Sequence, residues 1–292
     1  MKVNMDMLCA RVDISRQAHY QKLHREQQEE TRDILILELV RQVRRKHPQM
    51  GGRKVLHKIQ PMLTAERLKI GRDGLFDLLR GSDLLVKRKK RYRRTTIPGF
   101  WRAPNLLPGL MIGYPNQVWV CDITYVELEK NGFAYLFLLM DLYSRYILGW
   151  HAAPSLAAEG ALNCLQEAVP NLPEGVSTIH HSDHGVQYTS NAYMTTLKAY
   201  GIQISMGAVG NCYDNIFAER LINTLKNEYW LGDRFEDLAQ VNQMIPEVVH
   251  LYNTDRPHLA LDMAVPRDVY YGRKGNVKEL IIPATEMVTT DS

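Results

Sequence analysis

The spacing of apolar and polar positions divides the chain into a helical part and a mixed part. In the first hundred residues apolar side chains recur at helical spacing, which predicts helices over residues 16–24, 29–46, 53–62 and 71–79. Ser15 is a good N-cap for the first helix, and Gly51-Gly52 ends the second. A short apolar stretch over residues 7–11 precedes Ser15. This arrangement has helix-turn-helix spacing, with Arg16 near the start of a candidate recognition helix.

From about residue 116 onwards, short apolar runs alternate with amphipathic stretches. The runs predict strands over residues 118–128, 134–142, 145–152, 177–182 and 203–206, and the amphipathic stretches predict helices over residues 156–169, 191–200 and 215–230. Asn131-Gly132 predicts a tight hairpin, so the first three strands form an antiparallel meander. We therefore expect an α/β fold with a mixed five-stranded sheet and flanking helices, preceded by an all-α region.

Three carboxylates occupy positions typical of a metal site in such a fold. Asp122 lies inside the strand Val-Trp-Val-Cys-Asp-Ile, Asp183 lies where a strand runs into a loop, and Glu219 lies near the start of a helix. A lone Asp is usually a solvated surface residue, but a carboxylate inside an apolar strand is costly without a partner. We therefore interpret all three acids as catalytic metal ligands.

Mg²⁺ or Mn²⁺ would suit these ligands, because hard cations prefer oxygen donors. Two such ions, roughly 3.5–4 Å apart, activate a water or a 3′-hydroxyl and stabilise the leaving oxygen in phosphoryl transfer. Lys226 follows Glu219 by seven residues, on the same helical face, and we expect it to contact a DNA phosphate.

The chain resembles the insertion-sequence transposases of the IS-three family, and the resemblance covers about 160 residues. It rests on motifs whose order and spacing are specific: Trp119-x-x-Asp122-Ile123-Thr124-Tyr125, Asp141-x-x-Ser144-Arg145-x-Ile147-x-Gly149-Trp150, His181-Ser182-Asp183-x-Gly185-x-Gln187-Tyr188, Gly210-Asn211-Cys212-Tyr213-Asp214-Asn215-x-x-x-Glu219 and Tyr252-Asn253-x-x-Arg256-Pro257-His258-x-x-Leu261.

The resemblance implies a ribonuclease H-like integrase core and a DNA transposase. That enzyme would cut insertion-sequence ends and transfer the strands by DDE two-metal chemistry, with Asp122, Asp183 and Glu219 as the acids and Lys226 as the family's basic residue. It also implies double-stranded DNA as substrate, both transposon ends and target, and a homo-oligomer assembled on that DNA. Such a chain is often the product of an element's second reading frame and works with an upstream-frame DNA-binding partner. Gly51-Gly52-Arg53-Lys54-Val55 resembles the family's second helix-turn-helix, so Arg53 and Lys54 join the candidate DNA contacts.

Charge is distributed unevenly along the chain. Residues 1–100 hold 24 Lys and Arg against 11 Asp and Glu, whereas residues 101–292 hold 12 against 21. We expect the basic part to neutralise DNA phosphates and the acidic part to hold cations. Residues 87–94 are cationic at seven of eight positions and are interpreted as a DNA tether, with a solvated linker as the alternative; the cations are Lys87, Arg88, Lys89, Lys90, Arg91, Arg93 and Arg94.

These features predict a helical DNA-binding region over residues 1–95, a linker over 96–115, the catalytic core over 116–272 and a tail over 273–292. No apolar run is long enough to span a membrane, and no signal segment is evident. Four scattered cysteines favour a reducing compartment, here the bacterial cytoplasm near the nucleoid, and Cys121 and Cys164 are expected in the core.

Other polar residues have alternative roles. Asp141 is expected to form a structural ion pair with Arg145, and Asp214 to cap the Glu219 helix. His180, His181 and His184 lack the spacing of a zinc site, so His181 and His184 are interpreted as groups that orient Asp183 or face DNA. Arg256-Pro257-His258 has no assigned role. A catalytically silent DNA-binding regulator and a simple metal-dependent nuclease remain alternatives to the transposase.

Overall fold

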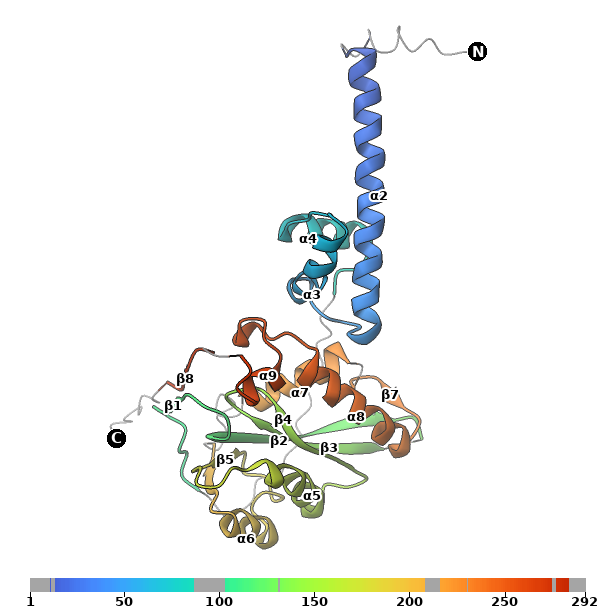
Figure 1. Cartoon of the computed structure of the whole chain (residues 1–292). Coiled ribbons are helices and arrows are strands. Elements are labelled where there is room, and N and C mark those ends of the chain that lie inside the picture. Colours follow the sequence, from blue (N-terminus) through green and yellow to red (C-terminus); the bar gives the residue numbers. More distant parts are fainter. Residues whose placement is uncertain are drawn as a thin grey trace, which may run out of the picture. The chain divides into compact units, whose positions relative to one another are not determined.

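A computed structural model of the 292-residue chain describes residues 11, 14–86, 103–130, 132–207, 216–229, 231–274 and 277–283. The chain forms two compact units, residues 1–87 and residues 88–292 (Figure 1). Each unit has hydrophobic clusters of its own. No helix in the described residues combines the length and the hydropathy that a membrane-spanning segment needs.

The first unit consists of three helices, α2 (Arg16–Lys46), α3 (Gly52–Ala65) and α4 (Arg72–Gly81). Only the C-terminal part of α2 is buried, through Ile36, Val40 and Val43, which pack against α3 and α4. Gly52 lets α4 approach closely, because a Cβ there would lie 3.0 Å from the Phe76 ring.

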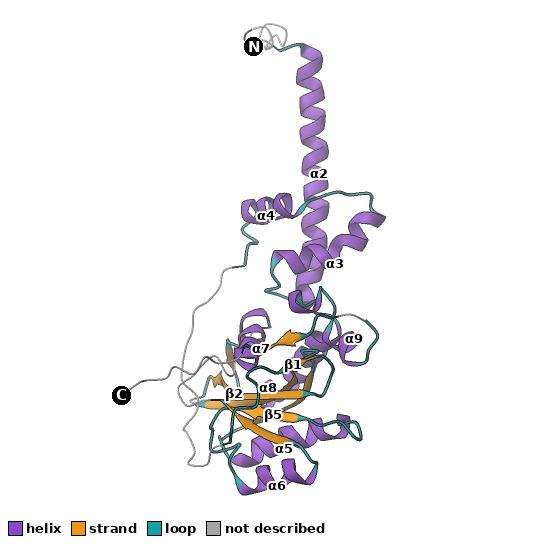
Figure 2. Ribbon diagram, turned by 90° about the vertical axis from the view of Figure 1, so that its left-hand side faces the viewer, coloured by secondary structure: helices purple, strands orange, loops and turns teal. Residues whose placement is uncertain are grey.

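The predicted break between residues 24 and 29 is wrong, since α2 continues through it (Figure 2). Residues 25–30 contain no Gly or Pro, and Arg, Glu and Gln all favour helix. A Lys22–Glu26 pair and the Thr31 hydroxyl, which donates to the Gln27 carbonyl, lie along this stretch. The predicted Ser15 cap is confirmed, because its Oγ accepts from the Ala18 N–H at 3.1 Å.

The second unit is built on a mixed sheet. Its main path runs in the order β4-β3-β2-β5-β6, comprising β2 (Val118–Leu128), β3 (Phe133–Asp141), β4 (Ile147–Ala153), β5 (Ile179–Ser182) and β6 (Gln203–Met206). β2, β3 and β4 form the predicted antiparallel meander, whereas β5 and β6 run parallel to β2. This topology confirms the ribonuclease H-like fold. The prediction of five strands was incomplete, because β7 (Arg234–Phe235) also pairs with β2.

Helices cover both faces of the sheet (Figure 1). α5 (Ala158–Ala168) and α6 (Asn191–Ala199) pack on one face, and α7 (Ile216–Glu228) and α8 (Leu238–Thr254) pack on the other. The 3₁₀ segments Val169–Asn171 and Leu259–Leu261 and the short helix α9 (Pro266–Tyr270) complete the described helical structure.

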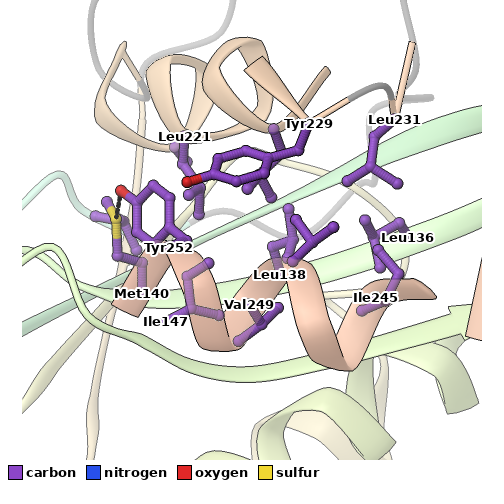
Figure 3. Close-up of a cluster of buried hydrophobic side chains, with 14 of the residues drawn as sticks. Leu136, Leu138, Met140, Ile147, Leu221, Tyr229, Leu231, Ile245, Val249 and Tyr252 are labelled. Atoms are coloured by element: carbon purple, nitrogen blue, oxygen red, sulfur yellow. Dashed lines mark hydrogen bonds between the residues drawn. The ribbon is translucent and has the colours of Figure 1, made fainter. Parts of the chain in front are cut away.

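The cluster under α7 and α8 joins these helices to the sheet (Figure 3). In this cluster Leu136 and Leu138 of β3 meet Leu221 of α7 and Ile245 of α8. The aromatic ring of Tyr252, at the end of α8, is buried there, with its hydroxyl 4.0 Å from the Met140 Sδ. The helix that carries Glu219 is therefore fixed to the sheet by a continuous apolar contact.

The predicted linker and tail are partly structured. β1 (Met111–Ile112) pairs antiparallel with β8 (Leu280–Ile281), and Leu107 and Ile112 are buried in the core of the second unit. Residues 103–115 and 277–283 therefore belong to this unit. Two-residue strands carry too short a pattern for periodicity to reveal.

Candidate functional site

The register of the central strands brings Asp122 and Asp183 together. β2 and β5 pair in parallel, with Val118 opposite Ile179 and Val120 opposite His181. Continued for two residues, to the position just after the end of β5 at Ser182, this register would set Asp122 opposite Asp183. Neighbouring strands lie about 4.8 Å apart, so the two carboxylates emerge side by side.

Glu219 and Lys226 approach the same place from α7. Side chains alternate between the faces of β2, which puts Asp122 on the face of Val120, the face that packs against α7. Glu219 lies in the first turn of α7 and is exposed, while Lys226 lies near its end. The Lys226 Nζ is 4.4 Å from the centroid of the Tyr125 ring on β2.

The charges of Asp183, Glu219 and Lys226 all act on the pKa of Asp122. Burial raises the pKa of Asp122 well above its usual value, and the charges of Asp183 and Glu219 raise it further. The Ile123 N–H, which donates to the Asp122 Oδ1 at 2.8 Å, and the charge of Lys226 act in the opposite direction. Burial also raises the pKa of Glu219.

This set of residues fits a hard divalent cation in chemistry, because its donors are carboxylate oxygens. The repulsion felt by Asp122 is the kind that a bound cation relieves. Within the described ranges, however, no three His, Cys, Asp or Glu side chains are grouped tightly enough to hold a metal ion as they stand.

The predicted DNA contacts differ in accessibility. Arg16 and Arg53 are exposed, on α2 and α3 respectively. Lys54 is buried with only 9% of its surface accessible, so we retain Arg53 rather than Lys54 as a candidate. The cationic run over residues 87–94 and the expected cap Asp214 lie outside the described residues.

Two of the histidines near Asp183 are buried and make contacts inside the second unit. Both His180 and His181 are fully buried, so the suggestion that His181 faces DNA is wrong. The His180 Nε2 lies 2.8 Å from the Tyr193 hydroxyl, and burial lowers the pKa of His180 to about 3. The His181 Nδ1 lies 2.8 Å from the Ser205 Oγ, which links β5 to β6. Cys121 and Cys164 are buried free thiols, as expected.

Asp141 forms hydrogen bonds instead of the expected ion pair. The carboxylate is fully buried and accepts from the backbone N–H groups of Asn116 and Ser144, both at 2.7 Å, and from the Ser144 hydroxyl. No direct ion pair joins it to Arg145 in the described residues. Because Asp141 is occupied in this way, it is a structural residue of the turn between β3 and β4.

Arg256 has a role that sequence reasoning missed. Its Nε and Nη2 donate to the two carboxylate oxygens of Glu228 at 2.7 and 2.9 Å, and its Nη1 lies 2.7 Å from the His258 Nε2. Glu228 is the last residue of α7, so Arg256 fixes that end of the helix to the segment after α8. The separation of 28 residues left no local signal of this pair.

Comparison with known families agrees with this architecture. Residues 114–212 match the family model described as "Integrase core domain", and residues 200–266 match a second model with the same description.

Several insertion-sequence proteins are similar over most of their length. The IS600 31 kDa protein of Shigella sonnei is 34% identical over 220 residues, which cover 72% of this chain and 78% of that protein. The putative transposase of IS986/IS6110 from Mycobacterium tuberculosis is 34% identical over 223 residues, covering 74% and 79%. The IS629 transposase of Shigella sonnei is 30% identical over 282 residues, covering 92% and 93%.

Among solved structures, the catalytic core domain of HTLV-2 integrase, in complex with magnesium, is 18% identical with a TM-score of 0.42. The match covers 57% of this chain and 99% of that one. A simian T-cell lymphotropic virus intasome structure contains a chain that is 16% identical with a TM-score of 0.45, covering 83% and 77%.

Proposed function

Because the chain belongs to the IS-three family of insertion-sequence transposases, which are DDE polynucleotidyl transferases, we propose that it cuts the ends of its element and joins them to target DNA at Asp122, Asp183 and Glu219. The parallel pairing of β2 with β5, which ends just before Asp183, together with the charges of Asp183 and Glu219 that raise the pKa of Asp122, supports the proposal.

The three carboxylates would hold two Mg²⁺ or Mn²⁺ ions. When bound, such ions activate a water or a 3′-hydroxyl and stabilise the leaving oxygen of the phosphodiester. The chain's own residues supply the framework for that chemistry. Backbone N–H groups fix one oxygen of each aspartate, since Ile123 donates to Asp122 and Gly185 donates to Asp183 at 3.0 Å.

Lys226 would bind the phosphate next to the scissile bond. Its ammonium lies over the Tyr125 ring and near Asp122, so it can reach DNA held at the carboxylates. The partners are double-stranded transposon ends and target DNA. The enzyme would act as a homo-oligomer on that DNA, together with an upstream-frame DNA-binding partner.

Metal rescue tests this assignment directly. Wild type, Asp122→Asn, Asp183→Asn, Glu219→Gln and Asp183→Cys are incubated with end DNA, and the cut and joined strands are mapped. We expect the amide variants to lose both products while retaining DNA binding. Asp183→Cys should be inactive with Mg²⁺ and regain cleavage with Mn²⁺, because a thiolate is a softer ligand. Cleavage by any amide variant removes that residue from the site.

The same assay separates the two alternative functions. Cut strands without joined strands would indicate a metal-dependent nuclease. Binding without cleavage by the wild type, with either metal, would indicate a DNA-binding regulator.

A further inference from the structure

The turn between β3 and β4 places a guanidinium beside the first turn of α7. The Arg145 guanidinium carbon lies 4.7 Å from the centroid of the Phe217 ring, and that of Arg220 lies 6.0 Å from the same ring. Phe217 and Arg220 are three residues apart and share a helical face. At about 100° per residue, Glu219 points away from Phe217, so the two arginines lie on a different side of α7 from the carboxylates.

The Arg145 guanidinium has no carboxylate bound directly to it within the described part of the chain. Its neighbour Asp141 already accepts three hydrogen bonds, and the Arg145 side chain makes no hydrogen bond or ion pair there. The Arg145 Nη1 is buried without an acceptor. A buried donor left unsatisfied costs about 1–3 kcal/mol, and more when the group is charged.

Arg220 increases this excess of positive charge. Burial lowers the pKa of Arg145, and the nearby charge of Arg220 lowers it further, against the opposing effects of Tyr252 and Asp141. Two guanidinium groups around one ring, with no carboxylate bound between them in the described residues, are complementary to an anion.

The backbone at Arg145 is strained. Its φ is +64°, a left-handed conformation that costs a residue with a Cβ about 1–2 kcal/mol and that Gly or Asn would adopt more easily. The turn therefore carries a long cationic side chain at a position where its geometry favours a small residue. Strain of this kind is typical of functional positions.

The charge and the hydrogen-bond donors of this site suit a phosphate group. The guanidinium fork matches phosphate oxygens, and the N-terminal end of a 13-residue helix adds a favourable dipole. Acids outnumber Lys and Arg by 21 to 12 in residues 101–292, so a pair of arginines without an acid partner in the described residues is a local exception. Resting on the proposed function, we infer that Arg145 and Arg220 bind a backbone phosphate of duplex DNA, away from the phosphate that reacts at the carboxylates.

The salt dependence of DNA binding tests the inference. The full chain is titrated with a labelled duplex in EDTA, which suppresses cleavage, over a series of salt concentrations. Arg145→Gln and Arg220→Gln each remove one phosphate contact, so each should reduce the log–log slope by about 0.9 and weaken binding to every duplex sequence. The matched control is Lys198→Gln, an exposed cation on α6 at the other face of the sheet, and its slope should equal that of the wild type.

A second comparison separates phosphate binding from support of the helix. Phe217→Leu removes the ring and keeps both charges, so it should lower the thermal midpoint without changing the slope. If Arg145 only supports α7, then Arg145→Gln will lower the thermal midpoint and leave the slope unchanged, as Phe217→Leu does. The inference then fails. The exposed Arg220 tests the site even where Arg145→Gln does not fold.

Two further outcomes would also overturn the inference. If the log–log salt slope is unchanged in both arginine variants, these residues bind no phosphate, whatever the cleavage assay shows. Unchanged slopes with an altered mass in sedimentation would assign the arginines to an acidic surface of a second copy. If the arginine variants have reduced slopes but the wild type never cleaves DNA, the phosphate site stands and the transposase chemistry is rejected. The failure of the inference and the failure of the proposed function can therefore be distinguished.

Discussion

At the scale of single residues, the surroundings of Asp122 disfavour its ionised form. Its pKa is raised by burial and by two other acids, and the charge of Lys226 and the Ile123 backbone N–H oppose that rise. The apolar strand around Asp122 indicated from sequence that this Asp needs a partner. The approach of Asp183 to Asp122 follows from the register between β2 and β5, which no local pattern encodes.

Asp122→Asn should stabilise the metal-free protein at neutral and higher pH. A folded-state pKa above the unfolded value of about 3.9 gives stability that is present below that value and is lost as the pH rises through the folded pKa. In EDTA, the thermal midpoint of Asp122→Asn should therefore exceed that of the wild type at about pH 7–8, and the difference should vanish towards about pH 4. Glu247→Gln, an exposed carboxylate on α8, is the control and should show no such trend. A variant less stable than the wild type at every pH would contradict this account.

Lys226→Ala should slow cleavage and joining about 10- to 100-fold with little loss of stability, because a charge-assisted contact of about 1.5–3 kcal/mol disappears. Lys226→Arg should keep part of the activity, since its charge survives in a different geometry. Removal of the cation should also raise the pKa of Asp122 and shift the acidic limb of the pH–rate profile upwards. Wild-type rates for the alanine variant at physiological salt would remove Lys226 from the site.

At the scale of elements, α7 is held at both ends. Phe217 in its first turn contacts Arg145, and Glu228 at its end binds Arg256. The Gly232 N–H donates to the Lys226 carbonyl at 3.2 Å, and a Cβ at Gly232 would lie 3.0 Å from that oxygen. The helical pattern of residues 215–230 predicted α7 itself. These anchors join distant parts of the chain, and the pattern contains no information about them.

Removal of either residue of the Arg256–Glu228 pair should strongly lower the free energy of unfolding. Arg256 is 5% and Glu228 17% exposed, so Arg256→Ala removes both guanidinium hydrogen bonds from a largely buried carboxylate and should cost about 3–5 kcal/mol in urea unfolding. The double variant with Glu228→Ala should cost less than the sum of the two single variants. Arg234→Ala, which breaks the exposed pair with Glu127, is the control and should cost at most about 1 kcal/mol. Additive effects at the buried pair would mean that the two residues act independently.

At the scale of the whole molecule, the sequence predicted the presence of two parts better than their boundaries. The charge counts separate a basic from an acidic part, and the folded chain divides into its two compact units at residue 87. The proline-rich composition of residues 98–115 predicts a linker, yet Leu107 and Ile112 are buried and β1 pairs with β8. Composition reports local backbone preference, whereas tertiary pairing decides whether such a segment packs.

The cationic run should supply DNA affinity that is independent of sequence. Replacing Lys87, Arg88, Lys89, Lys90, Arg91, Arg93 and Arg94 with Gln should weaken binding to all duplexes, because every phosphate that is no longer neutralised lowers the log–log salt slope by about 0.9. Cleavage of end DNA should persist at low salt, since the carboxylates are untouched. The control replaces three exposed lysines of the second unit, Lys130, Lys198 and Lys278, and should change the slope far less. An unchanged slope in the seven-residue variant would mean that the run is only a solvated connection between the two units. The DNA affinity would then have to come from α2, α3 and the pair formed by Arg145 and Arg220.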